Sequence, residues 1–128
     1  MAVVYSLLTI NARLQAVVNT IDAGSGNGQI VLLAGGTIVS TIALQKPSGT
    51  VNGGVLTFNG TLSDPSASGT GNVTTAQVKD SNGNVVVSGF TVGIPLATAD
   101  IIISNGLNST LITAGQAVQL LAAQITGS

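Results

Sequence analysis

The hydrophobic residues near the N-terminus recur at helical spacing. Between Ser6 and Gly24 most of them are separated by three or four positions, which places them on one side of a helix. These residues are Leu7, Leu8, Ile10, Leu14, Val17, Val18 and Ile21. Ser6 carries the hydroxyl group that favours an N-cap, and Gly24 is suited to the left-handed conformation that often ends a helix. The spacing therefore predicts an amphipathic helix over about residues 7–22.

The pattern changes after a glycine-rich linker at residues 24–28. Short runs rich in Val, Ile, Leu and Thr follow, each ended by Gly, Asn, Asp, Ser or Pro, and such runs are typical of β-strands. The predicted strands are 29–34, 37–44, 54–59, 72–79, 85–91, 100–104 and 118–126. A helix over 114–123 is an alternative to the last of them, and the strand is favoured.

These elements predict a mainly β protein that forms a single domain over residues 1–128. The β body covers residues 29–126, and the N-terminal amphipathic helix precedes it. Seven strands in about a hundred residues indicate an antiparallel β-sandwich or barrel.

Two turns and one apolar run refine this prediction. The segment 80–84 contains Asn-Gly, which readily takes the positive φ angles of a tight hairpin turn, so we expect a positive φ at Gly83. The Gly-Gly pair within 34–37 could form a second such turn. The three valines at 85–87 are apolar on both faces of a strand, which indicates that this strand is covered on both sides, by the helix or by a neighbouring subunit.

Charged residues make up only 5% of the chain, whereas 45% of it is hydrophobic. Soluble proteins usually carry about 25% charged residues, whose hydration keeps their surfaces apart. So low a charge content favours burial against other proteins and predicts a homo-oligomer. The candidate interface residues are Leu7, Leu14 and Val18 on the helix and Val86 in the apolar run. A monomer in which the helix covers an open sheet is the alternative interpretation.

The residue types that build most active sites are missing. The chain has no His, Cys or Trp, and its only acids are four aspartates, so no Ser or Thr has a histidine base and no paired-carboxylate spacing is present. We therefore predict no enzyme activity, no catalytic residue, no metal ligand, no cofactor and no small-molecule substrate. Asp80, Asn82 and Asn84 resemble part of a calcium loop, but the Glu of its twelfth position is absent, so capping of a hairpin turn is preferred.

The remaining composition argues against nucleic-acid and membrane partners. Three cations and four aspartates give a net charge of −1, and no basic cluster could neutralise several phosphates. The linker 24–28 lacks the Gly-Lys-Ser/Thr ending of a phosphate-binding loop. No stretch approaches the roughly 18 consecutive apolar residues of a membrane span, and the N-terminus lacks the charged start of a secretory signal. We expect a soluble protein that is made and assembled inside a cell.

Five blocks of sequence carry a family resemblance. They are NARLQAVVNTIDAG (11–24), GQIVLL (28–33), SGTVNGGVLTF (48–58), VKDSNGNVV (78–86) and LITAGQAV (111–118). The blocks span most of the chain and hold helix, hairpin-turn and strand signatures without catalytic residues. In them the chain resembles a group of small proteins encoded among bacteriophage head and tail genes.

The resemblance implies a virion structural protein, most similar to a capsid decoration or cement protein. Such proteins commonly form trimers on the outer shell, so the implied partners are other copies of the chain and the major capsid protein. The implied location is the outer capsid surface, after synthesis in the host cytoplasm. Two alternatives stay open: a receptor- or carbohydrate-binding module of a tail fibre, and a tail-tube or head–tail joining protein. A binding module should expose aromatic residues, and only Tyr5 could serve in that way.

Overall fold

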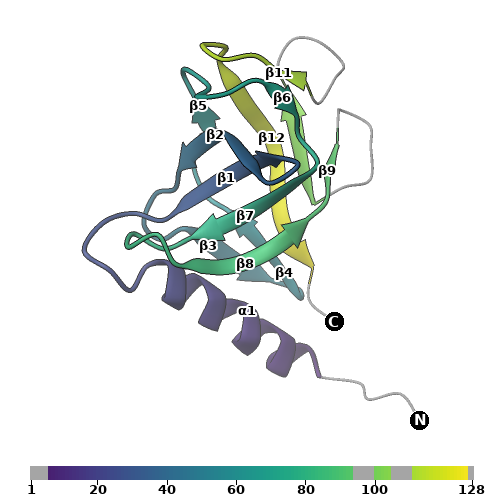
Figure 1. Ribbon diagram of the computed structural model, residues 1–128. Coiled ribbons are helices and arrows are strands. Elements are labelled where there is room, and N and C mark those ends of the chain that lie inside the picture. The colour runs from purple at the N-terminus through teal and green to yellow at the C-terminus, as the bar shows by residue number, and fades with distance from the viewer. Residues whose placement is uncertain (1–5, 94–99, 105–110, 127–128) are drawn as a thin grey trace.

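A computed structural model describes residues 6–93, 100–104 and 111–126. This part of the chain forms one helix and twelve strands (Figure 1). In chain order they are α1 (Leu7–Ile21), β1 (Gln29–Ala34), β2 (Thr37–Ala43), β3 (Gly49–Asn52), β4 (Val55–Phe58), β5 (Ser63–Asp64), β6 (Gly71–Asn72), β7 (Thr75–Lys79), β8 (Val85–Phe90), β9 (Val92–Gly93), β10 (Ile101–Ser104), β11 (Leu111–Ile112) and β12 (Val118–Thr126). The prediction of a mainly β protein with one N-terminal helix is confirmed.

The helix α1 begins and ends within one residue of its predicted bounds. The Ser6 hydroxyl accepts a hydrogen bond from the Thr9 N–H, 3.2 Å away, as an N-cap does. At the other end Asp22 is the C-cap, and its N–H donates to the Val18 carbonyl at 3.0 Å. Local capping chemistry therefore sets both ends of the helix.

The strands form two larger sheets and one small one. The four-stranded sheet has the order β2-β1-β7-β8, and the six-stranded sheet has the order β3-β4-β12-β10-β9, with β5 paired to β12. The strands β11 and β6 form the third sheet. Every pair is antiparallel except β9 with β10, which is parallel. Both larger sheets have open edges in the described residues, so the barrel alternative is wrong and the two sheets form a sandwich.

The helix packs across the two larger sheets at one end of the sandwich. It contacts β8 at the edge of the four-stranded sheet and β3 and β4 at the edge of the six-stranded sheet. Figure 1 shows α1 lying across this end of the β body. Side chains of α1 and of both sheets share one hydrophobic core. Within that core Phe58 and Phe90 meet edge to face, with ring centroids 6.4 Å apart.

Two β-bulges interrupt β8. Lys79 pairs with Val85 and Val78 pairs with Val87, so Val86 is an extra residue in the register. Near the other end Gly89 is extra in the same way, and its φ of 81° is one that glycine adopts without strain. The first bulge explains the apolar run, because Val86 and Val87 both pack partly against the core while Val85 stays exposed.

The long predicted strands are found, and the short ones were missed. The predictions 29–34 and 118–126 coincide with β1 and β12, so the alternative helix over 114–123 is wrong. The predicted strand 72–79 is divided into β6 and β7, which lie in different sheets: β6 pairs with β11, and β7 pairs with β1 and β8. The strands β3, β5, β9 and β11 were not predicted.

Candidate interaction surface

The helix divides the four candidate interface residues into two groups. Leu14 and Val18 are 5% and 2% exposed, since they belong to the core beneath α1. Leu7 is 55% exposed, and Val86 is partly buried at its bulge. Leu8, which was not among the candidates, is 81% exposed. Leu14 and Val18 therefore serve the fold itself, and a partner could contact Leu7 and Val86 but hardly these two.

The start of α1 is fixed to the turn between β3 and β4. The Gly54 N–H donates a hydrogen bond to Asn11 Oδ1 at 2.9 Å. The φ angles of Gly53 and Gly54, 61° and 80°, belong to a tight two-residue hairpin turn. This contact holds the exposed end of the helix, with Leu7 and Leu8, in one place on the β body.

The four-stranded sheet turns its second face away from the core, and we call this its outer face. Residues directly opposite each other in paired strands lie on the same side of a sheet, so the register identifies the members of this face. They are Ala43, Gln29, Lys79 and Val85 in one row, Thr41, Val31, Gln77 and Ser88 in the next, and Ile38, Leu33 and Thr75 in the third. In Figure 1 this sheet lies in front of β12.

The outer face is almost uncharged. Lys79 is the sole charged residue among its eleven members. Val85 and Ile38 are 51% and 39% exposed, which makes them two of the large hydrophobic side chains that the described residues leave open to solvent. The sequence analysis named Val86 as a candidate interface residue in this region. Because Val86 is the extra residue of the bulge and is partly buried, its neighbour Val85 is the exposed one.

Asp64 is a buried acid with a structural role. Its Oδ2 accepts from the Ser40 hydroxyl at 2.7 Å and from the Thr41 N–H at 3.3 Å, and its Oδ1 accepts from the Ser66 N–H at 3.1 Å. Ser40 is itself fully buried. Because Asp64 is in β5 of one sheet and Ser40 is in β2 of the other, the carboxylate joins the two sheets at the edge opposite α1.

Asp80 caps its hairpin, as predicted. Its Oδ1 accepts from the N–H groups of Asn82 and Asn84, both at 2.9 Å, and the Gly83 N–H donates to the Asp80 carbonyl. The hydrogen bond from the Asn84 backbone is the main reason why the pKa of Asp80 lies below its usual 3.8. Gly83 has the expected positive φ, at 86°. The carboxylate is thus occupied by the turn, which supports capping over calcium binding.

The glycine-rich linker is packed tightly beside the end of the helix. A Cβ on Gly28 would lie 2.8 Å from the Lys79 carbonyl oxygen, and Lys46 Nζ donates to the Gly24 carbonyl. Asp22 Oδ2 accepts from the Ser48 N–H at 3.0 Å. The buried Asp22 Oδ1 and Ser48 Oγ have no hydrogen-bond partner in the described part of the chain. The linker glycines therefore allow close packing, which is a structural reason for their presence.

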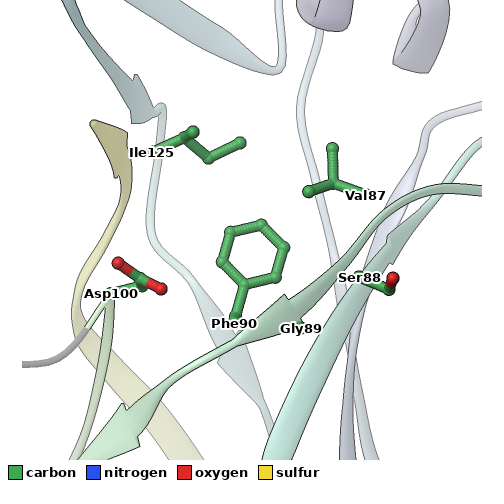
Figure 2. Close-up of a pocket in the computed structure, with 6 residues that line it drawn as sticks. All are labelled: Val87, Ser88, Gly89, Phe90, Asp100 and Ile125. Carbon is green, nitrogen blue, oxygen red and sulfur yellow. The ribbon is translucent and has the colours of Figure 1, made fainter. Parts of the chain in front are cut away.

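A hollow opens between the two larger sheets, beside β8. Its volume is about 190 Å³, and its walls come from β8, from the residue just before β10 and from the end of β12. The lining residues are Val87, Ser88, Gly89, Phe90, Asp100 and Ile125. Figure 2 shows the Phe90 ring between Ile125 and Val87, with the Asp100 carboxylate on the Ile125 side of the ring.

Thr91 holds Asp100 in position at this hollow. The Thr91 N–H donates to Asp100 Oδ2 at 3.1 Å, and the Asp100 N–H donates back to Thr91 Oγ1 at 2.9 Å. No residue of 6–93, 100–104 or 111–126 donates a hydrogen bond to Asp100 Oδ1. The hollow is therefore lined both by apolar side chains, those of Val87, Phe90 and Ile125, and by polar groups that include a carboxylate held by Thr91.

Two further kinds of site are absent from the described residues. No group of three or more His, Cys, Asp or Glu side chains comes together there as metal ligands would. No helix in this part of the chain is long and apolar enough to span a membrane. Tyr5, the candidate exposed aromatic, lies outside the described residues.

Compared with protein-family models, curated proteins and solved structures, the chain matches none of them.

Proposed function

We propose that this chain is a non-enzymatic structural protein of a bacteriophage virion, a capsid decoration or cement protein that binds the outside of the shell. The observation that supports this best is the outer face, where one charge stands among the nine residues that are at least partly exposed; Val31 and Leu33 of this face are buried. Threonine, glutamine and exposed aliphatic side chains can pack against a protein surface and hydrogen-bond to it without burying unpaired charge. Contacts of this kind depend little on salt, as a shell-stabilising protein requires.

The size of the outer face favours binding as an oligomer. Four strands about 4.8 Å apart, with about five residues each at 3.3 Å per residue, give a projected area of roughly 300 Å². A stable interface usually buries about 800 Å² on each partner. The outer face of one copy is therefore too small for a stable interface. The three outer faces of a trimer could bind the shell together and raise the affinity for it through multivalency. The exposed Leu7 and Leu8 would supply apolar surface for contacts between copies.

The test combines the mass of the protein in solution with its binding to empty phage capsids. Light scattering should give a trimer, and the protein should co-sediment with the capsids. Gln77→Lys adds a second cation beside Lys79 on the outer face and should weaken co-sedimentation at least tenfold. Gln15→Lys makes the same change on the exposed side of α1 and serves as the control, because it should leave binding unchanged.

Three results would count against this function. A monodisperse monomer that ignores capsids would contradict both the oligomer and the decoration role. Equal binding by the two lysine variants would exclude the outer face as the contact surface. A ring-sized mass without capsid binding would instead favour a tail-tube or head–tail joining protein.

A further inference from the structure

Five asparagines of this chain are followed directly by glycine: Asn27, Asn52, Asn59, Asn82 and Asn105. In such a pair the glycine nitrogen can attack Cγ of the asparagine side chain. A bond from nitrogen to Cγ forms, the bond from Cγ to Nδ2 breaks, and ammonia leaves with the glycine amide proton. Glycine favours this ring closure because it has no Cβ to hinder its nitrogen. Asn105 lies outside the described residues, so four pairs can be compared.

Water completes the reaction by opening the imide ring at one of its two carbonyl carbons. Opening at the side-chain carbonyl gives aspartate, whereas opening at the main-chain carbonyl gives isoaspartate, in which the chain continues through the side-chain carbons. The overall change replaces an amide by a carboxylate and needs no oxidant or reductant. Because the ring closes only when the side chain and the glycine nitrogen can approach each other, hydrogen bonds that hold either group slow the reaction.

Hydrogen bonds hold the reacting groups of two pairs. Asn59 Nδ2 donates to the Pro47 carbonyl at 3.3 Å, and Asn59 Oδ1 accepts from the Thr50 hydroxyl at 2.9 Å. In another pair the nucleophile itself is bound, since the Gly83 N–H donates to the Asp80 carbonyl at 3.1 Å. Ring closure at either pair has to break these contacts first.

Burial protects the pair in the glycine-rich linker. Gly28 is buried, and a Cβ on it would lie 2.8 Å from the Lys79 carbonyl oxygen. The Gly28 carbonyl also accepts from the Leu44 N–H at 2.9 Å. Ring closure at Asn27 turns this backbone and therefore has to open the packing of the linker against β7.

The pair at Asn52 is the most accessible of the four. Asn52 and Gly53 are both exposed and lie at the turn between β3 and β4. Because β3 is the edge of its sheet, it is paired on one side only, and such ends open more readily than a sheet interior. A Cβ on Gly53 would meet nothing within 4 Å. None of the described residues forms a hydrogen bond with the Asn52 side chain.

We propose that Asn52 converts spontaneously to isoaspartate and aspartate, faster than the other described pairs, and that isoaspartate at this turn releases the start of α1. Isoaspartate places one more carbon in the main chain beside the two-residue turn. That extra atom displaces Gly54, whose N–H binds Asn11 Oδ1 at 2.9 Å. The new carboxylate also adds a negative charge to a chain whose net charge is −1.

The first experiment incubates the protein in mildly alkaline buffer made with heavy-oxygen water, which labels each site where water opens a ring. Digestion with chymotrypsin, which cleaves after Phe58, places Asn52 and Asn59 in separate peptides for mass spectrometry. Label should appear at Asn52 at least about fivefold faster than at the other described pairs, the factor that one hydrogen bond provides. In protein unfolded by urea the pairs should react at similar rates, since their reacting groups are the same.

The second experiment measures hydrogen exchange of the Gly54 amide by NMR. It should exchange at least about fivefold faster in the isoaspartate fraction, separated by ion exchange, than in the unmodified protein. Asn52→Asp is the matched control, because it adds the charge without the extra main-chain atom and should exchange like the unmodified protein. Asn11→Ala removes the acceptor and shows the exchange rate of a released turn.

Each part of the proposal has a result that overturns it. The modification site is wrong if another described pair takes up label as fast as Asn52 in the folded protein, or if Asn52 leads by the same factor in urea. The release of α1 is wrong if Gly54 exchanges equally in the isoaspartate fraction and in Asn52→Asp. Neither experiment uses a capsid, so failure here leaves the decoration function standing, and failure of decoration leaves this site standing.

Discussion

Replacing Leu14 and Leu8 by alanine in separate variants tests how α1 contributes to the fold. Both residues lie on the same helix and lose the same atoms, but Leu14 is 5% exposed and Leu8 is 81% exposed. Comparison of the two variants therefore tests whether α1 is part of the hydrophobic core or only lies on the surface of the β body.

The expected difference follows from these exposures. Leu→Ala removes three carbon groups, each of which contributes about 0.8 kcal/mol when buried, or about 2.4 kcal/mol in all. At Leu14 nearly all of this is lost, and the cavity left between α1 and the sheets raises the cost to about 3 kcal/mol. At Leu8 only about a fifth of the transfer term applies, or about 0.5 kcal/mol. The higher helix propensity of alanine partly offsets even that.

The assay is urea unfolding followed by circular dichroism at one fixed protein concentration, with the mass checked by light scattering. A fixed concentration is needed because association of copies would change the apparent stability. With a denaturant slope of about 2 kcal/mol per molar urea, Leu14→Ala should lower the midpoint by about 1.5 M and Leu8→Ala by less than about 0.3 M. A loss of unfolding free energy below about 1 kcal/mol for Leu14→Ala, or equal losses in both variants, would show that α1 does not pack against the two sheets in solution.

Four further predictions concern Asp64, Gly83, Gly28 and Asp80. Asp64→Ala leaves the buried Ser40 hydroxyl without its acceptor and should cost about 3 kcal/mol in free energy of unfolding, and a double-mutant cycle with Ser40→Ala should show coupling above about 0.5 kcal/mol. Gly83→Val, strained at a φ of 86°, should cost about 1 kcal/mol or more. Gly28→Ala should also destabilise the protein, since its Cβ would crowd a backbone carbonyl; equal stability of either glycine variant in urea would contradict these assignments. Because hydrogen bonds lower the pKa of Asp80 in the folded state, its contribution to stability should be complete at neutral pH and disappear as the pH falls from 3.8 through the folded pKa, so Asp80→Asn should lose less stability than the unmodified protein between pH 7 and pH 3.

The elements with strong local signals were predictable from the sequence. The helix has a cap at Ser6 and a continuous apolar stripe, and β1 and β12 are long enough for their composition to identify them. The turn at Gly83 was predictable because its conformation depends on the turn residues themselves. In each of these cases the structure is determined by residues that are neighbours in the chain.

The missed features depend on residues far apart in the chain. The strand β5 has two residues and exists because it pairs with β12, more than fifty positions later. Burial of Asp64 was not predictable, since a carboxylate is buried only where donors meet it, and here Ser40 comes from another sheet. The members of the outer face could be identified only from the register of four strands. The bulge at Val86 determines that Val85 is the exposed valine. The hollow combines residues 87–90 with Asp100 and Ile125, which no spacing in the sequence connects.

The two bulges of β8 have a consequence for how copies of this protein can assemble. A free sheet edge with a regular row of donors and acceptors can pair with the edge of another molecule and grow into an endless ribbon. Most proteins discourage this with charged side chains, but this chain has charges at only 5% of its positions. The extra residues Val86 and Gly89 break the row on β8 instead, so a second strand cannot stay in step along it. Irregular backbone thus does at this edge what lysine does at the edges of many other sheets, and it disfavours open-ended growth through β8.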